Sequence, residues 1–215
     1  MSPQENPVTA IDILLEPDAT MVSHAEAVNA RLLKNFPKGF ALDATHRAHV
    51  TVLQRFVRTA DLDKVYAAVA KVLAQEGTVK SWRLKAFKYY YIPQKTIGLG
   101  GIVVEPTQDL LRLQRELIDT VAPFTAPTGT AAAFVTTPQD PDINQPTIDY
   151  IAAFVPDHSG EHYSPHVTIG IGTVEYLNAM LAAPFDTFTF SPVGASVYQL
   201  GNYGTAMKQL HSFEL

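Results

Sequence analysis

The sequence predicts an α+β protein in which two pseudo-symmetric lobes of antiparallel sheet, with flanking helices, surround a central cleft. The first observation is a repeated tetrapeptide: His49-Val50-Thr51-Val52 returns as His166-Val167-Thr168-Ile169. The second is that each copy is followed by a predicted helix and then by further strands. This repeated order predicts two related lobes that both offer a motif strand to one cleft. We expect residues 1–215 to form a single two-lobed domain.

The first half of the chain predicts alternating strands and helices. A Pro-Lys-Gly sequence at 37–39 ends the first helix. Thr59 or Asp61 can cap the second helix and Gly77 closes it. Residues 93–96 join a pair of strands. We expect strands at 9–15, 48–57, 82–92 and 97–104, and helices at 18–36, 59–77 and 107–121.

The second half begins with a long connector, residues 122–146, which is rich in Pro, Thr and Ala and has little periodicity. A polar loop at 156–164 leads into the second motif strand. Turns are expected at 192–194 and 201–204. We expect strands at 147–155, 165–171, 185–190, 196–200 and 205–214, and one helix at 174–181.

Length and composition place limits on the class of protein. A chain of 215 residues with 47% apolar residues can bury a substantial core. No apolar run has the length needed to cross a bilayer, and the first residues lack the parts of a signal peptide. We therefore expect a cytoplasmic monomer without a membrane partner, or the mature part of an exported protein. Because the sequence contains no cysteine, disulfides, thiolate chemistry and cysteine-ligated zinc are excluded.

The charge distribution is uneven. A net charge of −5 argues against a general nucleic-acid binder, which needs a basic face to neutralise phosphates. All but one of the 16 Lys and Arg residues lie at or before Arg115, and none lies between Glu116 and Met207. An anionic ligand would therefore be attracted mainly by the first half. The alternative interpretation is a solvated basic strand face.

The two motifs suggest acid–base chemistry. Alternate side chains of a strand share a face, so each motif presents an imidazole beside a hydroxyl. Since an imidazole titrates near pH ~6.5, one can accept a proton while another donates one. Phosphodiester cleavage needs both transfers, and needs donors for the phosphate oxygens. We expect His49 and His166 to be catalytic and Thr51 and Thr168 to bind the substrate, without a metal or other cofactor.

The HVTV and HVTI motifs, their separation and the order of elements after each resemble the two-histidine phosphoesterase superfamily, which includes 2′-5′ RNA ligase-like proteins and cyclic nucleotide phosphodiesterases. The resemblance covers most of the chain. It implies a bilobal α+β fold and metal-independent hydrolysis of a 2′,3′-cyclic phosphate or a related phosphodiester. It also implies that one histidine is the base and the other the acid, with the assignment left open.

Further substrate contacts are expected around the motifs. The second half contains almost no cation to follow a polynucleotide, so a small nucleotide or an RNA end is the expected substrate, without an extended nucleic-acid surface. On the strand at 85–91, Tyr89 and its odd-numbered aromatic neighbours share one face, while Tyr90 lies on the other; one of these faces could stack a base. The additional candidates are Arg47, Arg55, Tyr89 and Tyr163.

Three other functions compete with this interpretation. His158, His162 and His166 are spaced four apart, as zinc ligands on a helix would be, but Gly160 and Pro165 oppose a helix there. A non-catalytic nucleotide sensor would retain the cleft without turnover. A 2′-5′ RNA ligase-like activity would require an extended basic surface, which this sequence does not indicate.

Overall fold

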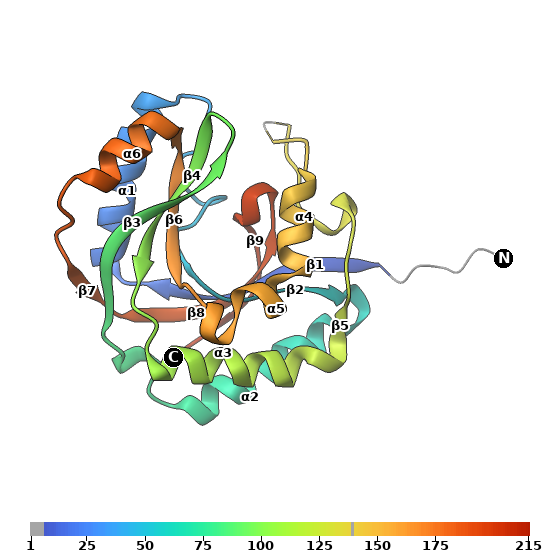
Figure 1. The fold of residues 1–215 in the computed structure, drawn as a ribbon. Helices are drawn as coiled ribbons and strands as arrows, with labels where there is room; N and C mark the ends of the chain where they lie inside the picture. Colours follow the sequence, from blue (N-terminus) through green and yellow to red (C-terminus); the bar gives the residue numbers. More distant parts are fainter. Residues whose placement is uncertain (1–6, 139) are drawn as a thin grey trace.

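The computed structural model describes residues 7–138 and 140–215 and contains two antiparallel sheets (Figure 1). The five-stranded sheet has the order β5-β2-β1-β8-β9, and the four-stranded sheet has the order β6-β4-β3-β7. The strands of the larger sheet are β1 (Val8–Pro17), β2 (Val50–Arg58), β5 (Thr125–Ala126), β8 (Pro192–Leu200) and β9 (Ala206–Phe213). Those of the smaller sheet are β3 (Leu84–Gln94), β4 (Ile97–Val104), β6 (His166–Thr173) and β7 (Phe188–Phe190).

The predicted bilobal α+β architecture is confirmed, and the two lobes exchange strands. The first motif lies on β2 of the larger sheet, yet the two strands that follow it, β3 and β4, belong to the smaller sheet. The second motif lies on β6 of the smaller sheet, and the later strands β8 and β9 return to the larger one. Each sheet is therefore built from both halves of the chain.

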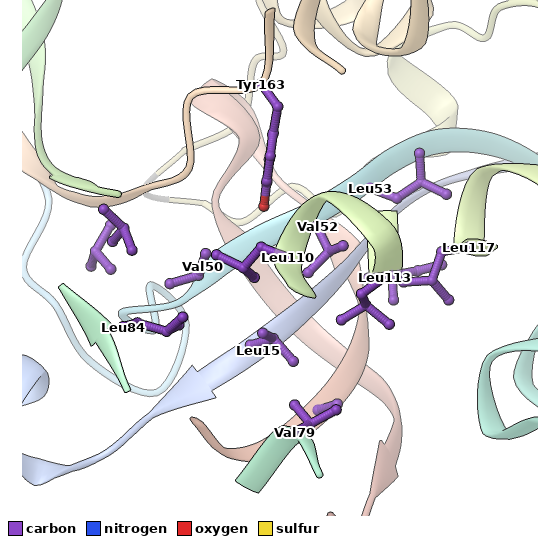
Figure 2. Packing of buried hydrophobic residues seen from close by; sticks show 14 of the residues in the cluster. Leu15, Val50, Val52, Leu53, Val79, Leu84, Leu110, Leu113, Leu117 and Tyr163 are labelled. Carbon is purple, nitrogen blue, oxygen red and sulfur yellow. The ribbon is translucent and has the colours of Figure 1, made fainter. Parts of the chain in front are cut away.

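Helices cover both sheets. Their bounds are α1 (Ala19–Asn35), α2 (Leu62–Glu76), α3 (Gln108–Val121), α4 (Gln145–Ala152), α5 (Phe154–His158) and α6 (Val174–Ala182). Helices α1 and α6 contact the smaller sheet, while α2 and α3 pack against each other and α3 contacts β2 (Figure 1). In Figure 2 the apolar face of α3, with Leu110, Leu113 and Leu117, lies over β1 and β2. No helix in the described residues is long and apolar enough to cross a membrane.

The predicted alternation along both motif strands is confirmed. Val50 and Val52 are buried in the core, whereas Thr51 between them is only partly buried (Figure 2). On β6, Val167 and Ile169 are fully buried while Thr168 is partly exposed. The apolar residues of each motif thus hold its strand against the core, and the His and Thr residues face the opposite way.

The prediction of a strand at 147–155 is wrong, because this segment forms α4 and α5. Asn144 accepts a hydrogen bond from the Thr147 backbone nitrogen at 2.8 Å and caps α4. Ile148, Ile151 and Phe154 are all buried, at intervals of three residues that follow a helical and not a strand period. The segment is apolar, as the strand prediction required, but its period is that of a helix.

Smaller differences occur at element ends. The predicted turn at 192–194 is the beginning of β8, which pairs there with the end of β1. The connector at 122–146 includes β5, which pairs with β2. Asp61 does not cap α2, because its carboxylate instead accepts hydrogen bonds from Arg58 Nε at 2.6 Å and Lys64 Nζ at 2.8 Å. Gly77 closes α2 as predicted, with a φ of 58° that favours glycine.

Candidate active site

The two His-x-Thr motifs line a single cavity of about 310 Å³. His49 directly precedes β2 and Thr51 lies on it, while His166 and Thr168 lie on β6, so each motif contributes one imidazole and one hydroxyl to the cavity. Helices α4 and α5 and the strand pair β3 and β4 provide most of the remaining wall. The aromatic and aliphatic side chains in this wall include Tyr90, Ile92, Leu99, Tyr150, Phe154 and Tyr163.

Both imidazoles are held by the same backbone contact. His49 Nδ1 lies 2.6 Å from the carbonyl oxygen of Arg47, and His166 Nδ1 lies 2.9 Å from the carbonyl oxygen of Ser164. In each case the carbonyl belongs to the residue two positions earlier. Because a carbonyl oxygen only accepts, Nδ1 is the protonated nitrogen in both rings. Nε2 is therefore the nitrogen that each histidine can use for proton exchange.

A buried carboxylate distinguishes the two histidines. Asp12, on β1, is fully buried, and its Oδ2 lies 3.4 Å from His49 Nε2. The same oxygen accepts hydrogen bonds from Thr51 Oγ1 at 2.6 Å and Gln54 Nε2 at 2.9 Å. Among the described residues, His49 is the only cationic or titratable base paired with Asp12. His166 has no comparable acid beside it within the same part of the chain.

The pKa values of the two imidazoles are shifted in opposite directions. Burial lowers the pKa of His49, but the hydrogen bond and negative charge of Asp12, together with the Arg47 carbonyl, outweigh burial, so its pKa is raised above 6.5. For His166, burial is the main cause and lowers the pKa to about 4, with the nearby His49 adding to the effect. At neutral pH His166 is neutral, while His49 is the histidine that favours the protonated form.

The two threonines are also not equivalent. Thr51 donates its hydroxyl hydrogen to Asp12, so toward the cavity it can only accept. Thr168 lines the same cavity and makes no side-chain hydrogen bond to the described residues, so its hydroxyl can donate to a ligand. The sequence predicted that both threonines bind the substrate, but the hydrogen bond to Asp12 gives Thr51 a different set of contacts from Thr168.

Of the additional candidates, Tyr163 lies in the cavity wall and the other three do not. The Tyr163 hydroxyl donates to the Thr51 carbonyl oxygen at 2.7 Å, and Figure 2 shows its ring pointing toward the strand that contains Val50 and Val52. Burial raises the pKa of this phenol far above 10, so it stays protonated. Tyr163 therefore supports the first motif strand and also forms part of the cavity surface.

Arg47 and Arg55 are not among the residues that line this cavity, and their predicted contact with the substrate stays a prediction. Arg47 contributes its backbone carbonyl to His49, and the residue itself borders two neighbouring hollows, one with Glu16 and Glu26 and a smaller one with His49 and Thr168. Arg55 points the other way and donates to Thr125 Oγ1 at 3.3 Å, on the neighbouring strand β5. Arg55 has the same parity as His49 and Thr51, but the register of β2 against β1 shifts between Thr51 and Leu53, so the residues after this shift face the opposite way.

Tyr89 does not line the cavity, and its ring packs edge-on against Phe185 with centroids 4.7 Å apart. The tyrosine of this strand that does line the cavity is Tyr90, whose ring lies 4.8 Å from that of His166. It fits there because its cross-strand partner is Gly101, where a Cβ atom would collide with the tyrosine ring. The sequence separated the two faces of this strand correctly, but the predicted face is not the one that borders the cavity.

Several residues of the site were not predicted. Asp12, which lies behind the cavity wall, had a sequence signal, since it is the single acid in the predicted strand at 9–15. Tyr150 and His158 lie on α4 and α5, and their rings stack with centroids 4.2 Å apart. Tyr150 was missed because its segment was assigned to a strand, and His158 was considered only as a zinc ligand in the loop at 156–164.

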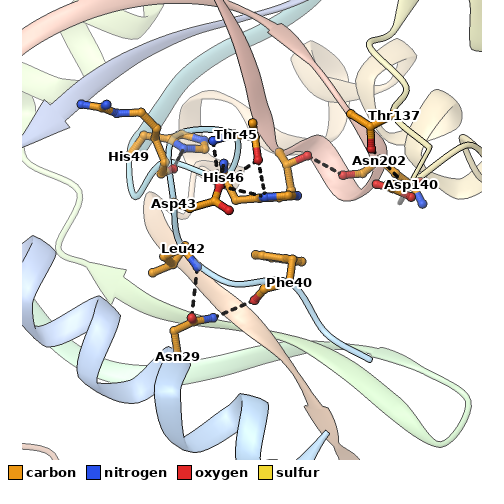
Figure 3. Close-up of polar contacts among 12 residues, drawn as sticks. Asn29, Phe40, Leu42, Asp43, Thr45, His46, His49, Thr137, Asp140 and Asn202 are labelled. Carbon is orange, nitrogen blue, oxygen red and sulfur yellow. Dashed lines mark hydrogen bonds and ion pairs between the residues drawn. The ribbon is translucent and has the colours of Figure 1, made fainter. Parts of the chain in front are cut away.

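The loop that leads into the first motif is held by α1 (Figure 3). Asn29 Nδ2 donates to the Phe40 carbonyl oxygen at 3.0 Å, and Asn29 Oδ1 accepts from the Leu42 backbone nitrogen at 3.0 Å. The same Nδ2 donates to the Ile169 carbonyl oxygen of β6, also at 3.0 Å. Gly170 permits this approach, since its φ is +126° and a Cβ atom there would lie 2.7 Å from Asn29 Nδ2.

The three histidines that suggested zinc do not share a helical face. His158 ends α5, His162 lies in the short turn Gly160–His162, and His166 begins β6. Within residues 7–138 and 140–215, no group of three or more potential ligand side chains is arranged to hold a metal ion.

No family model matches the sequence, and no curated protein matches it either. Among solved structures, TT0787 of Thermus thermophilus superposes with a TM-score of 0.54 at 14% identity, covering 96% of this chain and 98% of that chain. E. coli LigT complexed with 3′-AMP gives 0.48 at 12% identity, covering 97% and 98%. Kluyveromyces marxianus Usb1 gives 0.40 at 8% identity, covering 99% and 100%.

The likeness to TT0787 extends over nearly the whole of both chains and shows a shared fold. The fold and the site together define a two-lobed α+β protein in which two His-x-Thr strands face one cavity. The shared fold agrees with the bilobal α+β fold that the resemblance in the sequence implied.

Proposed function

We propose that this protein is a phosphodiesterase that hydrolyses a 2′,3′-cyclic phosphate or a related small nucleotide phosphodiester by two-histidine acid–base catalysis, without a metal. The observation that supports this most directly is that both imidazoles donate through Nδ1 to a backbone carbonyl and border the same cavity. Each therefore has Nε2 available for the reacting atoms. Two such groups at one phosphorus centre fit a reaction that removes one proton and adds another.

We assign His166 as the general base and His49 as the general acid. His166 Nε2 takes a proton from water while the water oxygen bonds to phosphorus. His49 Nε2 gives its proton to the ribose oxygen as the bond between that oxygen and phosphorus breaks. The product is a phosphomonoester, and the two histidines exchange protons with solvent to return to their starting states. The opposite pKa shifts of the two rings support this order.

The cavity favours a small substrate with a single negative charge. None of the 16 Lys and Arg residues lines this cavity, and Arg47 borders a smaller adjoining hollow with His49 and Thr168. Of the two motif threonines, Thr168 is the one with a hydroxyl hydrogen to donate to a non-bridging oxygen. The aromatic wall with Tyr90 and Tyr150 suits a nucleobase. A polynucleotide backbone would find no row of Lys and Arg side chains along this cavity.

The experiment is turnover of a panel of 2′,3′-cyclic nucleotides in the presence of chelator, with products identified by mass. We expect His49→Ala and His166→Ala each to lower kcat by about 10²–10⁴-fold. His211→Ala is the matched control, because this histidine stacks on Tyr66 and lies outside the cavity. Its turnover should match that of the wild type.

Three outcomes would favour other functions. Binding of the cyclic nucleotides without turnover would indicate a sensor, and turnover that is abolished by chelator and restored by zinc would indicate a zinc hydrolase. Joining of RNA ends in place of hydrolysis would indicate a 2′-5′ RNA ligase-like activity. Each result contradicts the proposed phosphodiesterase.

A further inference from the structure

The carboxylate of Asp12 lies in the interior of the protein without a Lys or Arg partner among the described residues. Asp12 is 0% exposed, and in this part of the chain the one ion-pair contact of its carboxylate is with His49 Nε2, at 3.4 Å. A buried carboxylate is costly unless a cation or several hydrogen bonds compensate its charge. His49 is therefore the group that can neutralise Asp12, and it does so only when it is protonated.

The contacts of Asp12 converge on one oxygen. Thr51 Oγ1, Gln54 Nε2 and His49 Nε2 all lie within 3.4 Å of Oδ2, whereas no described residue bonds to Oδ1. Gln54 is the direct cross-strand neighbour of Asp12 in the pairing of β1 with β2. The sheet therefore fixes the position of the carboxylate, and Oδ2 is directed at the motif strand.

The contact with His49 is longer than the other two. Ordinary charge-assisted hydrogen bonds between nitrogen and oxygen measure about 2.7–2.9 Å. At 3.4 Å, Oδ2 lies close enough to favour the charged imidazole and too far to hold its Nε2 hydrogen firmly. The hydrogen stays available to a better-placed acceptor in the cavity.

We propose that Asp12 is a positioning residue that keeps His49 protonated and its Nε2–H ready for transfer, until the leaving oxygen of a bound phosphodiester replaces Oδ2 as the acceptor. This inference rests on the proposed function for the transfer step. Its first part, the charged pair of Asp12 and His49, is a property of the protein without substrate. Thr51 belongs to the same unit, because its hydroxyl stabilises the carboxylate that acts on His49.

Other charged groups also surround His49. From β6, His166 faces it across the cavity, and the hollow on its other side is bordered by Glu16, Glu26, Asp43, His46 and Arg47. Within the described residues, none of these forms an ion pair with His49, whereas Asp12 does. Asp12 is therefore the charged group that most favours protonation of the His49 imidazole, and the raised pKa of His49 agrees with this.

The test is an NMR titration of the histidine ring carbons in the full chain, with the His49 signal assigned by its loss in His49→Ala. In Asp12→Asn, which keeps the size and shape of the side chain, we expect the midpoint of His49 to fall by at least about one pH unit. The ring of His211, which lies outside the cavity, provides the reference signal. An unchanged His49 midpoint in a folded Asp12→Asn variant would overturn the proposal.

The wild type and a second variant provide readouts that do not depend on the folding of Asp12→Asn. In the wild type, His49 must titrate at higher pH than His166, and the reverse order would overturn the proposal. Gln54→Met removes one hydrogen bond to Oδ2 but preserves the negative charge. We expect His49 to keep a raised midpoint in this variant, and a fall as large as that in Asp12→Asn would show that packing and not charge is responsible.

Turnover separates the inference from the proposed function. If the function is correct, Asp12→Asn lowers kcat about 10–100-fold with little change in KM, and the alkaline limb of the pH profile moves to lower pH. If the wild type turns over no phosphodiester but the His49 midpoint still depends on Asp12, the charged pair stands and the proposed function fails. A change in KM alone, without movement of the alkaline limb, would contradict the positioning role.

Discussion

The side-chain amide of Asn29 donates a hydrogen bond to the carbonyl oxygen of Ile169 and so connects α1 with the strand that contains His166. The same amide holds the loop before the strand that contains His49, through Phe40 and Leu42. One buried side chain, 4% exposed, thus contacts the approaches to both motifs. The relative position of the two imidazoles depends on this residue.

We expect Asn29→Ala to lower both stability and turnover. It leaves two carbonyl oxygens and one backbone nitrogen without partners, at a cost of about 1–3 kcal/mol for each buried group that water does not reach. Asn35→Ala is the matched control, because Asn35 accepts from the Thr173 backbone nitrogen at the far end of β6. Both variants should unfold at lower denaturant concentration. Equal losses of kcat in the two would contradict a specific role for Asn29.

The pH dependence of kcat/KM should be bell-shaped. Productive enzyme has neutral His166, whose pKa burial lowers to about 4, and protonated His49, whose pKa is raised chiefly by Asp12 against the effect of burial. Activity should therefore rise as pH increases through about 4 and fall as pH passes the pKa of His49, above 6.5. Residual activity of His49→Ala should lack the alkaline limb. Loss of the acid limb in that variant would reverse the assignment.

Tyr90 and Tyr89 provide a matched pair for the cavity wall. Tyr90→Ala removes a ring beside His166 and should raise KM for a cyclic nucleotide about tenfold, in line with about 1–3 kcal/mol for stacking one base. Tyr89→Ala removes a ring that packs on Phe185 and should lower stability with KM unchanged. Steady-state kinetics and thermal unfolding of both variants test this. A larger change in KM for Tyr89→Ala would place the substrate on the other face.

The two threonines should respond differently to the same substitution. Thr168→Val removes a free hydroxyl and should lower kcat/KM about 10–100-fold while the protein remains as stable as the wild type. Thr51→Val removes a 2.6 Å hydrogen bond to a buried carboxylate and should cost about 1–3 kcal/mol of unfolding free energy. Urea unfolding and kinetics distinguish the two effects. Identical behaviour of both variants would restore the symmetric role predicted from the sequence.

The sequence predicted the local pattern of the motifs more fully than their surroundings. Alternation along β2 and β6 follows from the pleat of a strand, so residue order predicted that Val50 and Val167 are buried in the core and that the His and Thr side chains lie on the other face. The capping of α3 by Thr107 is equally local. Such features depend on residues only a few positions apart, so the amino-acid sequence is enough to predict them.

Contacts between distant segments could not be predicted in this way. Asp12 and Thr51 are 39 positions apart, and Tyr90 is placed in the cavity by its pairing with Gly101 and by a bulge near Ala86. Which of two alternating faces is turned toward a ligand depends on the other elements packed around the strand. The helix period at Ile148, Ile151 and Phe154 was present in the sequence, but β-branched residues favoured the strand interpretation.

The exchange of strands between the sheets has a consequence for how the molecule can be divided. A fragment ending before β6 would retain β3 and β4 without their neighbours β6 and β7, and would leave β1 without β8. Neither half of the polypeptide can complete a sheet by itself. A nascent chain therefore cannot form either complete sheet until its last strands have been synthesised. Two separately expressed halves should consequently be inert alone and recover turnover only when mixed, as in a split-reporter assay.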